Sequence, residues 1–166
     1  MIRILFATSE AYPLVKTGGL ADVSASLPAA LCRAGHDCQL ILPGYPATIN
    51  AALEAGSKRV TRFRYGQYEV VIWKTSLPNT SVALWLVECP ALFERPGDSP
   101  YQNENGEDWW DNAYRFHLFS RICAMAAMGQ LGLSWKPDIV HCNDWQTGLL
   151  PVFLKSFHAS PPTVFT

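Results

Sequence analysis

This chain of 166 residues lacks any regular spacing of cysteines, and that absence excludes two kinds of protein. The five cysteines are odd in number, scattered along the chain and free of any C-x-x-C pair. Disulfide scaffolds and structural zinc sites need cysteines at short, regular spacings, so we expect neither. We expect reduced thiols and therefore a cytoplasmic protein. The cysteines are Cys32, Cys38, Cys89, Cys123 and Cys142.

The chain also lacks an excess of charge and any long hydrophobic run. Its 13 Lys and Arg residues and 14 Asp and Glu residues give a formal net charge of −1. This balance gives no electrostatic attraction to nucleic acid or to an anionic membrane. No apolar run approaches the roughly 20 residues that cross a bilayer, and residues 1–6 become polar too quickly for a signal peptide. We therefore expect neither nucleic acid nor membrane as a partner.

The glycine motifs of common nucleotide-binding folds are absent as well. A dinucleotide site needs G-x-G-x-x-G directly after the first strand and an acidic residue at the end of the second strand. Here Gly18 and Gly19 lie well beyond the first apolar run, and Pro43 stands at the acidic position. His141 and Asp144 are close in sequence, but no third metal ligand accompanies them. The sequence predicts neither a metal site nor a bound cofactor.

What the chain does contain is the pattern of a single α/β domain. Its length and its 49% of hydrophobic residues are enough for one sizeable core. Short apolar runs alternate with helical periodicity, which predicts a Rossmann-like, mostly parallel sheet. Three runs rich in β-branched and aromatic residues predict an added β-hairpin or meander. We expect strands at 2–8, 38–42, 60–65, 68–75, 82–87, 138–142 and from 162 onward, helices at 19–34, 111–130 and 145–157, and a polar loop at 96–108.

Two of these expectations concern proline and the last strand. Pro28 lies within the first helix, where it should kink the helix or mark the start of a second helical piece. Residues 163–166 have the pattern of a core strand that nothing follows, whereas natural domains rarely stop within a core strand. We therefore expect the chain to be an N-terminal piece of a longer protein.

The most informative motif is Lys16-Thr17-Gly18-Gly19-Leu20-Ala21-Asp22-Val23. It follows an apolar strand and leads into a helix, and this is where α/β folds bind phosphate. Glycines let the backbone approach a ligand, and the free N–H groups and dipole of the helix N-terminus favour an anion. The alternative is an ordinary strand–helix turn that needs glycine for its φ angles. Local chemistry does not separate these two interpretations.

Residues 7–23 as a whole resemble the N-terminus of bacterial glycogen synthases and plant starch synthases. The motif at 16–23 is highly specific in this setting, whereas the other matching segments are individually weak. The resemblance covers essentially the whole chain in the right order. It continues at residues 27–31, 42–45, 92–97, 111–112, 115–116 and 137–146.

The resemblance implies the N-terminal half of a two-domain glycosyltransferase of the GT-B architecture. Such a protein transfers glucose from ADP-glucose to the non-reducing end of an α-1,4-glucan with retention of configuration, and without a metal. The family places most nucleotide contacts in a C-terminal domain, so we expect the present chain alone to be inactive. Two alternatives remain open, namely a non-catalytic carbohydrate-binding or regulatory module and a related transferase that uses UDP-glucose.

The resemblance also implies roles for individual residues. Lys16, Gly18 and Gly19 correspond to the donor phosphate site, and Lys16 and Asp144 are the expected catalytic residues. Asn143 departs from the family pattern His-x-His-Asp-Trp, so no imidazole is available at that position. The residues expected to bind the sugar or the acceptor are Glu10, Asp22, Tyr101, Asn112 and Asp144.

Each acceptor-site expectation has a plainer structural alternative. Asp144 stands at a strand–helix junction, where Asp is often only an N-cap. Glu10 could be a simple loop acid, and Asp22 could merely favour the positive end of the helix. Tyr101 could anchor its loop to the core instead of stacking on a glucan.

Overall fold

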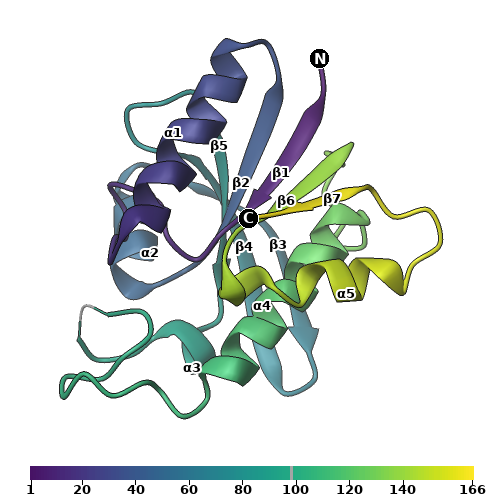
Figure 1. Ribbon diagram of the computed structural model, residues 1–166. Helices are drawn as coiled ribbons and strands as arrows, with labels where there is room; N and C mark the ends of the chain where they lie inside the picture. Colours follow the sequence, from purple (N-terminus) through teal and green to yellow (C-terminus); the bar gives the residue numbers. More distant parts are fainter. Residues whose placement is uncertain (98) are drawn as a thin grey trace.

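The computed structural model describes residues 1–97 and 99–166. They form one seven-stranded sheet in the order β3-β4-β5-β2-β1-β6-β7, with helices on both faces (Figure 1). The elements are β1 (Arg3–Ala7), α1 (Gly19–Arg33), β2 (Asp37–Pro43), α2 (Pro46–Glu54), β3 (Lys58–Tyr65), β4 (Tyr68–Ser76), β5 (Ala83–Glu88), α3 (Pro90–Phe93), α4 (Asn112–Ala127), β6 (Ile139–Cys142), the 3₁₀ helix η1 (Trp145–Thr147), α5 (Leu150–Lys155) and β7 (Thr163–Phe165).

The parallel part of the sheet is buried on both faces. Strand β1 lies between β2 and β6 and is parallel to both. Successive residues of a strand point to opposite faces, so Leu5 packs with α4 and α5, whereas Phe6 packs with α1 and α2. A strand covered on both faces must be apolar throughout, which explains the continuous run at the start of the chain. This confirms the predicted Rossmann-like α/β class.

The three strands β3, β4 and β5 form the expected antiparallel meander. β3 pairs with β4, β4 pairs with β5, and β5 then joins the parallel part through β2. Gly66, with a φ of 58°, supplies the left-handed residue of the turn between β3 and β4. β3 is an edge strand that carries several basic residues, and such charges discourage pairing with another chain.

Several elements differ from the sequence-based expectation, and proline accounts for two of them. α1 is one helix that runs through Pro28, so of the two outcomes expected at this proline, a kink or a restart, the restart is wrong. The expected helix at 145–157 is instead η1 followed by the short α5, because Pro151 lacks an N–H group and fits only the first turn of a helix. The helix α2 was not expected. In the loop at 96–108, Gln102 and Asp108 form an isolated β-bridge.

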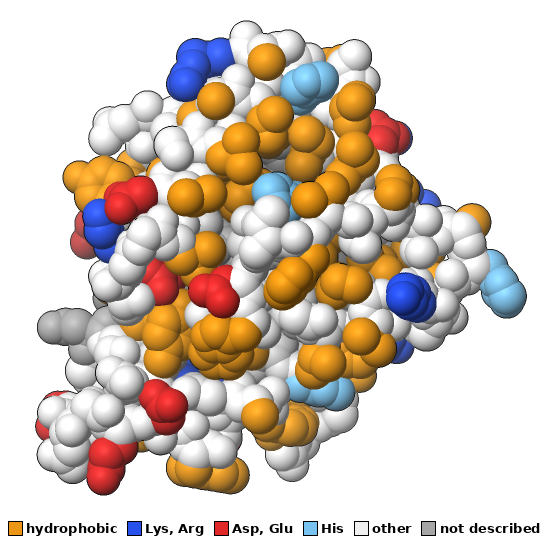
Figure 2. All heavy atoms as spheres, viewed as in Figure 1, with side chains coloured by type: hydrophobic (Ala, Val, Ile, Leu, Met, Phe, Trp, Pro, Cys, Tyr) orange, Lys and Arg blue, Asp and Glu red, His pale blue; other side chains and the backbone are white. Residues whose placement is uncertain are grey.

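No helix within the described residues is long and apolar enough to cross a membrane. The same view as space-filling spheres shows hydrophobic side chains gathered across the centre of this face (Figure 2). The exposed large hydrophobic residues of the last elements are Trp145, Leu149, Val152, Val164 and Phe165.

Candidate functional site

The candidate site lies at the carboxyl edge of the parallel strands, where doubly wound folds bind their ligands. The segments that follow β1, β2 and β6 meet there, as expected from the sequence. The Tyr45 hydroxyl, after β2, donates to the Ser9 carbonyl, after β1, at 3.1 Å. After β6, the Asn143 amide donates to the Ala7 carbonyl at 3.0 Å. These hydrogen bonds fix three loops relative to one another.

Gly18 and Gly19 lie exposed at the start of α1, and the chain itself does not require glycine at either position. Neither residue has a positive φ, and Gly18 is extended with a φ of −154°. A Cβ added at either glycine would meet no atom within 4 Å. Gly44 differs, because a Cβ there would come within 2.8 Å of Ile49. The alternative of a turn that needs glycine for its φ angles is therefore wrong, and the space above Gly18 and Gly19 is open.

The first turn of α1 offers its backbone N–H groups without a side-chain cap. Gly18 is the N-cap residue and provides no side-chain hydrogen bond. The first N–H groups of a helix have no carbonyl partner within it, so together with the dipole they favour an anion at this point.

Glu10 organises the loop in front of α1 from the interior of the protein. Its side chain is 2% exposed. Thr17 donates to it twice, from its backbone N–H at 2.6 Å and from its hydroxyl at 2.6 Å, and the Gly18 N–H lies at 3.4 Å from the same carboxylate. The Tyr101 hydroxyl donates to Glu10 Oε1 at 2.8 Å. Both carboxylate oxygens are thus occupied by the protein, and neither points freely toward a ligand.

Tyr101 connects the polar loop to this network. Its hydroxyl lies 2.7 Å from the Ser9 hydroxyl as well as within reach of Glu10, and burial raises the pKa of its phenol far above the ordinary value. Its ring packs against Phe116 and Trp145 at centroid distances of 5.7 and 5.8 Å. Tyr101 therefore anchors its loop, while its half-buried ring remains part of the wall of the site.

Asn112 and Arg115 hold the same loop from α4. The Asn112 amide donates to the Tyr101 carbonyl at 2.8 Å, and its oxygen accepts from Arg115 Nη1 at 2.7 Å. Arg115 is fully buried and also donates to the carbonyls of Leu92 and Pro100, at 2.6 and 3.0 Å. Burial lowers the pKa of its guanidinium from the ordinary value. The loop that carries Tyr101 is thus fixed at several points.

Lys16 and Asp22 face each other across the start of α1. The Lys16 ammonium lies 2.7 and 2.8 Å from the two oxygens of Asp22, and both side chains are about half exposed. The structure thus brings together a residue expected to bind phosphate and one expected to bind sugar. An incoming phosphate would compete with Asp22 for the lysine.

Asp144 stands at the end of β6 in a strained backbone conformation. Its φ is 63° and its ψ 176°, a region populated almost only by glycine. Its carboxylate accepts from the N–H of Trp145 at 2.6 Å and so caps η1. Asp144 is therefore an N-cap, as the structural alternative predicted, and it is also exposed at the candidate site. Backbone strain of this kind clusters at functional sites.

Trp145 belongs to the site, although the sequence-based list of site residues omits it. It is 52% exposed and packs edge-on against Phe116 at 5.1 Å, beside the ring of Tyr101. The signal in the sequence was its position directly after Asp144 at the end of a strand. An exposed aromatic face next to hydroxyl and carboxylate groups suits the apolar face of a sugar ring.

Asn143 takes a structural role at the position where the family pattern has a histidine. It is 2% exposed, and besides its bond to Ala7 its oxygen accepts from the Thr166 hydroxyl at 3.0 Å. The His141 ring lies 3.1 Å from the same hydroxyl and 4.7 Å from the ring of Phe6. Partial burial lowers the pKa of His141. Within the described residues, no three His, Cys, Asp or Glu side chains form a group that could hold a metal.

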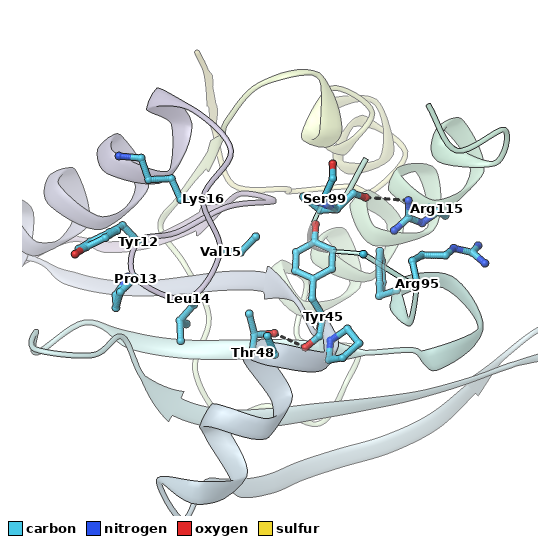
Figure 3. Close-up of a pocket in the computed structure, with 15 residues that line it drawn as sticks. Tyr12, Pro13, Leu14, Val15, Lys16, Tyr45, Thr48, Arg95, Ser99 and Arg115 are labelled. Atoms are coloured by element: carbon cyan, nitrogen blue, oxygen red, sulfur yellow. Dashed lines mark hydrogen bonds between the residues drawn. The ribbon is translucent and has the colours of Figure 1, made fainter. Parts of the chain in front are cut away.

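A cavity of about 560 Å³ lies beside the site, between the loop before α1, the start of α2 and the segment after α3 (Figure 3). We call it the arginine cavity, because Arg95 and Arg115 are among its 15 lining residues. Tyr45 lies at its centre, and Leu14 and Phe93 form apolar parts of its wall.

Comparison with known proteins agrees with this architecture. The family model described as the starch synthase catalytic domain matches residues 3–166. The chain is 74% identical over 166 residues to a glycogen synthase of Marinobacter nauticus, and 49% identical to one of Cellvibrio japonicus. Each alignment covers all of this chain but 34% of the relative, so the chain spans about a third of the length of these proteins.

A solved structure shows the same likeness. It is the catalytic domain of starch synthase IV from Arabidopsis thaliana, bound to ADP and acarbose. The match has a TM-score of 0.72 and 25% sequence identity, and it covers 99% of this chain and 33% of that one.

Proposed function

This chain belongs to the family of starch synthase catalytic domains, and we propose that it is the N-terminal domain of a glycosyltransferase with two Rossmann-like domains, the GT-B architecture. The complete protein transfers glucose from ADP-glucose to the non-reducing end of an α-1,4-glucan, with retention of configuration. The relatives named glycogen synthase and the ADP and acarbose bound to the starch synthase IV domain support this activity.

The observation that carries the proposal is the open glycine pair at the start of α1. Glycine is required there neither by φ nor by packing, so the remaining reason for it is close approach of a ligand to the backbone. The uncapped helix start favours an anion. The donor's phosphates meet both requirements. The N–H of Gly19 and the Lys16 ammonium then stabilise the negative charge that develops on the leaving diphosphate.

Lys16 and Asp22 act together in this proposal. Their ion pair holds the ammonium beside the helix start before the donor arrives. When a diphosphate takes over the lysine, the Asp22 carboxylate is released to accept hydrogen bonds from sugar hydroxyls. Glu10 acts from behind as a positioning residue, because its bonds to Thr17 and Gly18 fix the loop that carries Lys16.

The sugar side of the site is formed by Asp144, Trp145 and Tyr101. Asp144 presents its second carboxylate oxygen to hydroxyl groups while the first caps η1. Trp145 and Tyr101 supply aromatic surface for a glucose ring. Asn112 contributes by holding the Tyr101 backbone.

We also propose that a C-terminal domain outside this sequence completes the active site, so that the present chain alone is inactive. The exposed hydrophobic residues on η1, α5 and β7 provide a surface against which further chain can pack. The five free cysteines agree with a reducing compartment such as the cytoplasm.

The test is glucosyl transfer to glycogen by the complete protein, with ADP-glucose and UDP-glucose offered separately. We expect transfer from ADP-glucose, and a fall in kcat of about 100-fold in Lys16→Ala, because a charge that stabilises the leaving group is lost. Lys58→Ala, on the edge strand β3, is the matched control and should keep the wild-type rate.

Two results would contradict this proposal. Transfer from UDP-glucose alone would reassign the donor while keeping the reaction class. No transfer from either donor by a folded protein would favour a non-catalytic carbohydrate-binding module.

A further inference from the structure

Three basic side chains line the arginine cavity. Among its described lining residues, Lys16, Arg95 and Arg115 are cationic and none is acidic. The side chain of Arg95 is compensated by an ion pair with Asp111. Arg115 has no such carboxylate partner within residues 1–97 and 99–166, where its hydrogen bonds go to two backbone carbonyls and to the amide oxygen of Asn112. Among the described residues, Arg115 is therefore the lining cation that is not neutralised by an ion pair.

One nitrogen of Arg115 is left without a hydrogen bond. The Arg115 side chain is fully buried, and its Nη2 atom has no hydrogen-bond partner among the described residues. A buried guanidinium N–H without an acceptor costs free energy. In Figure 3 the Arg115 guanidinium lies at the edge of the cavity, beside Ser99 and facing Tyr45. An acceptor placed in the cavity would satisfy it.

The start of α2 adds a second, independent attraction for an anion. Pro46, Ala47 and Thr48 form the first turn of this helix and line the cavity. The first helical hydrogen bond runs from the Ile49 N–H to the Tyr45 carbonyl at 2.9 Å, so the N–H groups before it have no helical partner. The N-cap Tyr45 makes no side-chain cap, and the first turn has no acidic residue. The positive end of the helix dipole thus points into the cavity.

We propose that the arginine cavity binds a small phosphomonoester, with its phosphate between Arg115 and the start of α2. A phosphate matches a site where a fork-shaped guanidinium lies near the positive end of a helix. The volume of about 560 Å³ exceeds what free phosphate needs and is within the range of small-molecule sites. Leu14, Phe93 and the hydroxyl of Ser99 form the wall for a compact polar body attached to the phosphate.

This site is separate from the donor phosphate site, and its existence does not depend on the proposed transfer reaction. The donor site uses the exposed surface of Gly18 and Gly19, neither of which lines the cavity. Lys16 borders both, but its ammonium is held by Asp22 and points away from the cavity in Figure 3.

The experiment is isothermal titration calorimetry of the complete protein with glucose 1-phosphate, glycerol 3-phosphate, inorganic phosphate and free glucose. Removing Arg115 would also release Leu92 and Pro100, so the decisive variant is Ala47→Glu, which places a carboxylate at an exposed position on the cavity wall. We expect both phosphomonoesters to bind more tightly than inorganic phosphate and glucose. Ala47→Glu should weaken their binding about tenfold or more, by charge repulsion at the helix start.

Two matched controls isolate the charge and its location. Ala47→Gln adds similar bulk without charge, and Ala51→Glu adds the same charge one turn further along α2, outside the cavity; both should bind like the wild type. Equal binding of glucose and glucose 1-phosphate, unchanged affinity in Ala47→Glu, or displacement of the phosphomonoester by ADP would each overturn the proposal. Displacement by ADP would show that the probe occupies the donor site instead. Because this assay reads binding and not transfer, it can fail while the proposed enzymatic activity holds.

Discussion

At the scale of single residues, several side chains of the candidate site combine a structural contact with a position on the surface of the site. Asp144 caps η1 and remains exposed at the site, and Tyr101 anchors its loop while keeping its ring in the wall. Glu10 is the clearest departure from the sequence-based expectation of a sugar contact. Its carboxylate is enclosed by Thr17, Gly18 and Tyr101, so we propose that Glu10 positions the loop that carries Lys16.

The backbone strain at Asp144 predicts that two substitutions which both remove the carboxylate will differ in stability. Asp144→Gly and Asp144→Ala both lose the carboxylate, but only glycine adopts a φ of 63° with this ψ without strain. We expect the glycine variant to be more stable than the alanine variant by about 1–3 kcal/mol in urea unfolding of the protein. Both variants should lose most of their glucosyl transfer. Equal stabilities would show that this backbone conformation stores no strain.

At the scale of elements, an ion pair joins the beginnings of β1 and β6, at the edge of the sheet opposite to the site. Arg3 Nη2 lies 2.7 Å from Asp138 Oδ1, and the Arg3 backbone N–H donates to the same carboxylate at 2.9 Å. These bonds lower the pKa of Asp138 to about 2. The pair is exposed to solvent, so its contribution to stability is limited by screening.

This pair predicts a specific pH dependence. The pKa of an unfolded Asp is about 3.9, so the stabilisation by Asp138 is fully present above that value and is lost as pH falls toward about 2. The difference in free energy of unfolding between the wild type and Asp138→Asn should therefore be constant from neutral pH to about pH 5, shrink below about pH 4 and be lost as the pH falls through about 2. Denaturant unfolding at stepped pH measures it, with Glu54→Gln on the exposed side of α2 as the control. A difference as large at pH 2 as at neutral pH would contradict the assigned cause.

Across the whole molecule, the sequence predicted the elements that a short run of apolar or turn-forming residues identifies. β1 and β2 were recognisable because a strand buried on both faces is continuously apolar, and the meander because its turns carry Gly66 and Pro78. α2 was missed because it is nine residues long and follows a proline-rich turn that reads as the end of a strand.

The sequence predicted where the site residues lie along the sheet, but not which hydrogen bonds they form. The glycine pair and Asp144 could be placed at strand ends because parallel strands share one carboxyl edge. The contacts of Glu10 could not, because its partners Thr17 and Tyr101 lie seven and 91 residues away in the chain. The same holds for Arg115, whose backbone acceptors are Pro100 in the loop and Leu92 in α3, 15 and 23 residues earlier.

The central claim is that the open helix start at Gly18 and Gly19 receives the donor's phosphates, and Gly19→Ala tests it most directly. The added Cβ meets no atom of the protein, so the fold should be as stable as the wild type or slightly more stable, since alanine favours helix. The measurement is kcat/KM for ADP-glucose in the complete protein, alongside thermal unfolding. We predict a fall of about 100-fold with an unchanged melting temperature, because the methyl group occupies the space of the phosphate. Wild-type kcat/KM in a stable Gly19→Ala protein would contradict the claim.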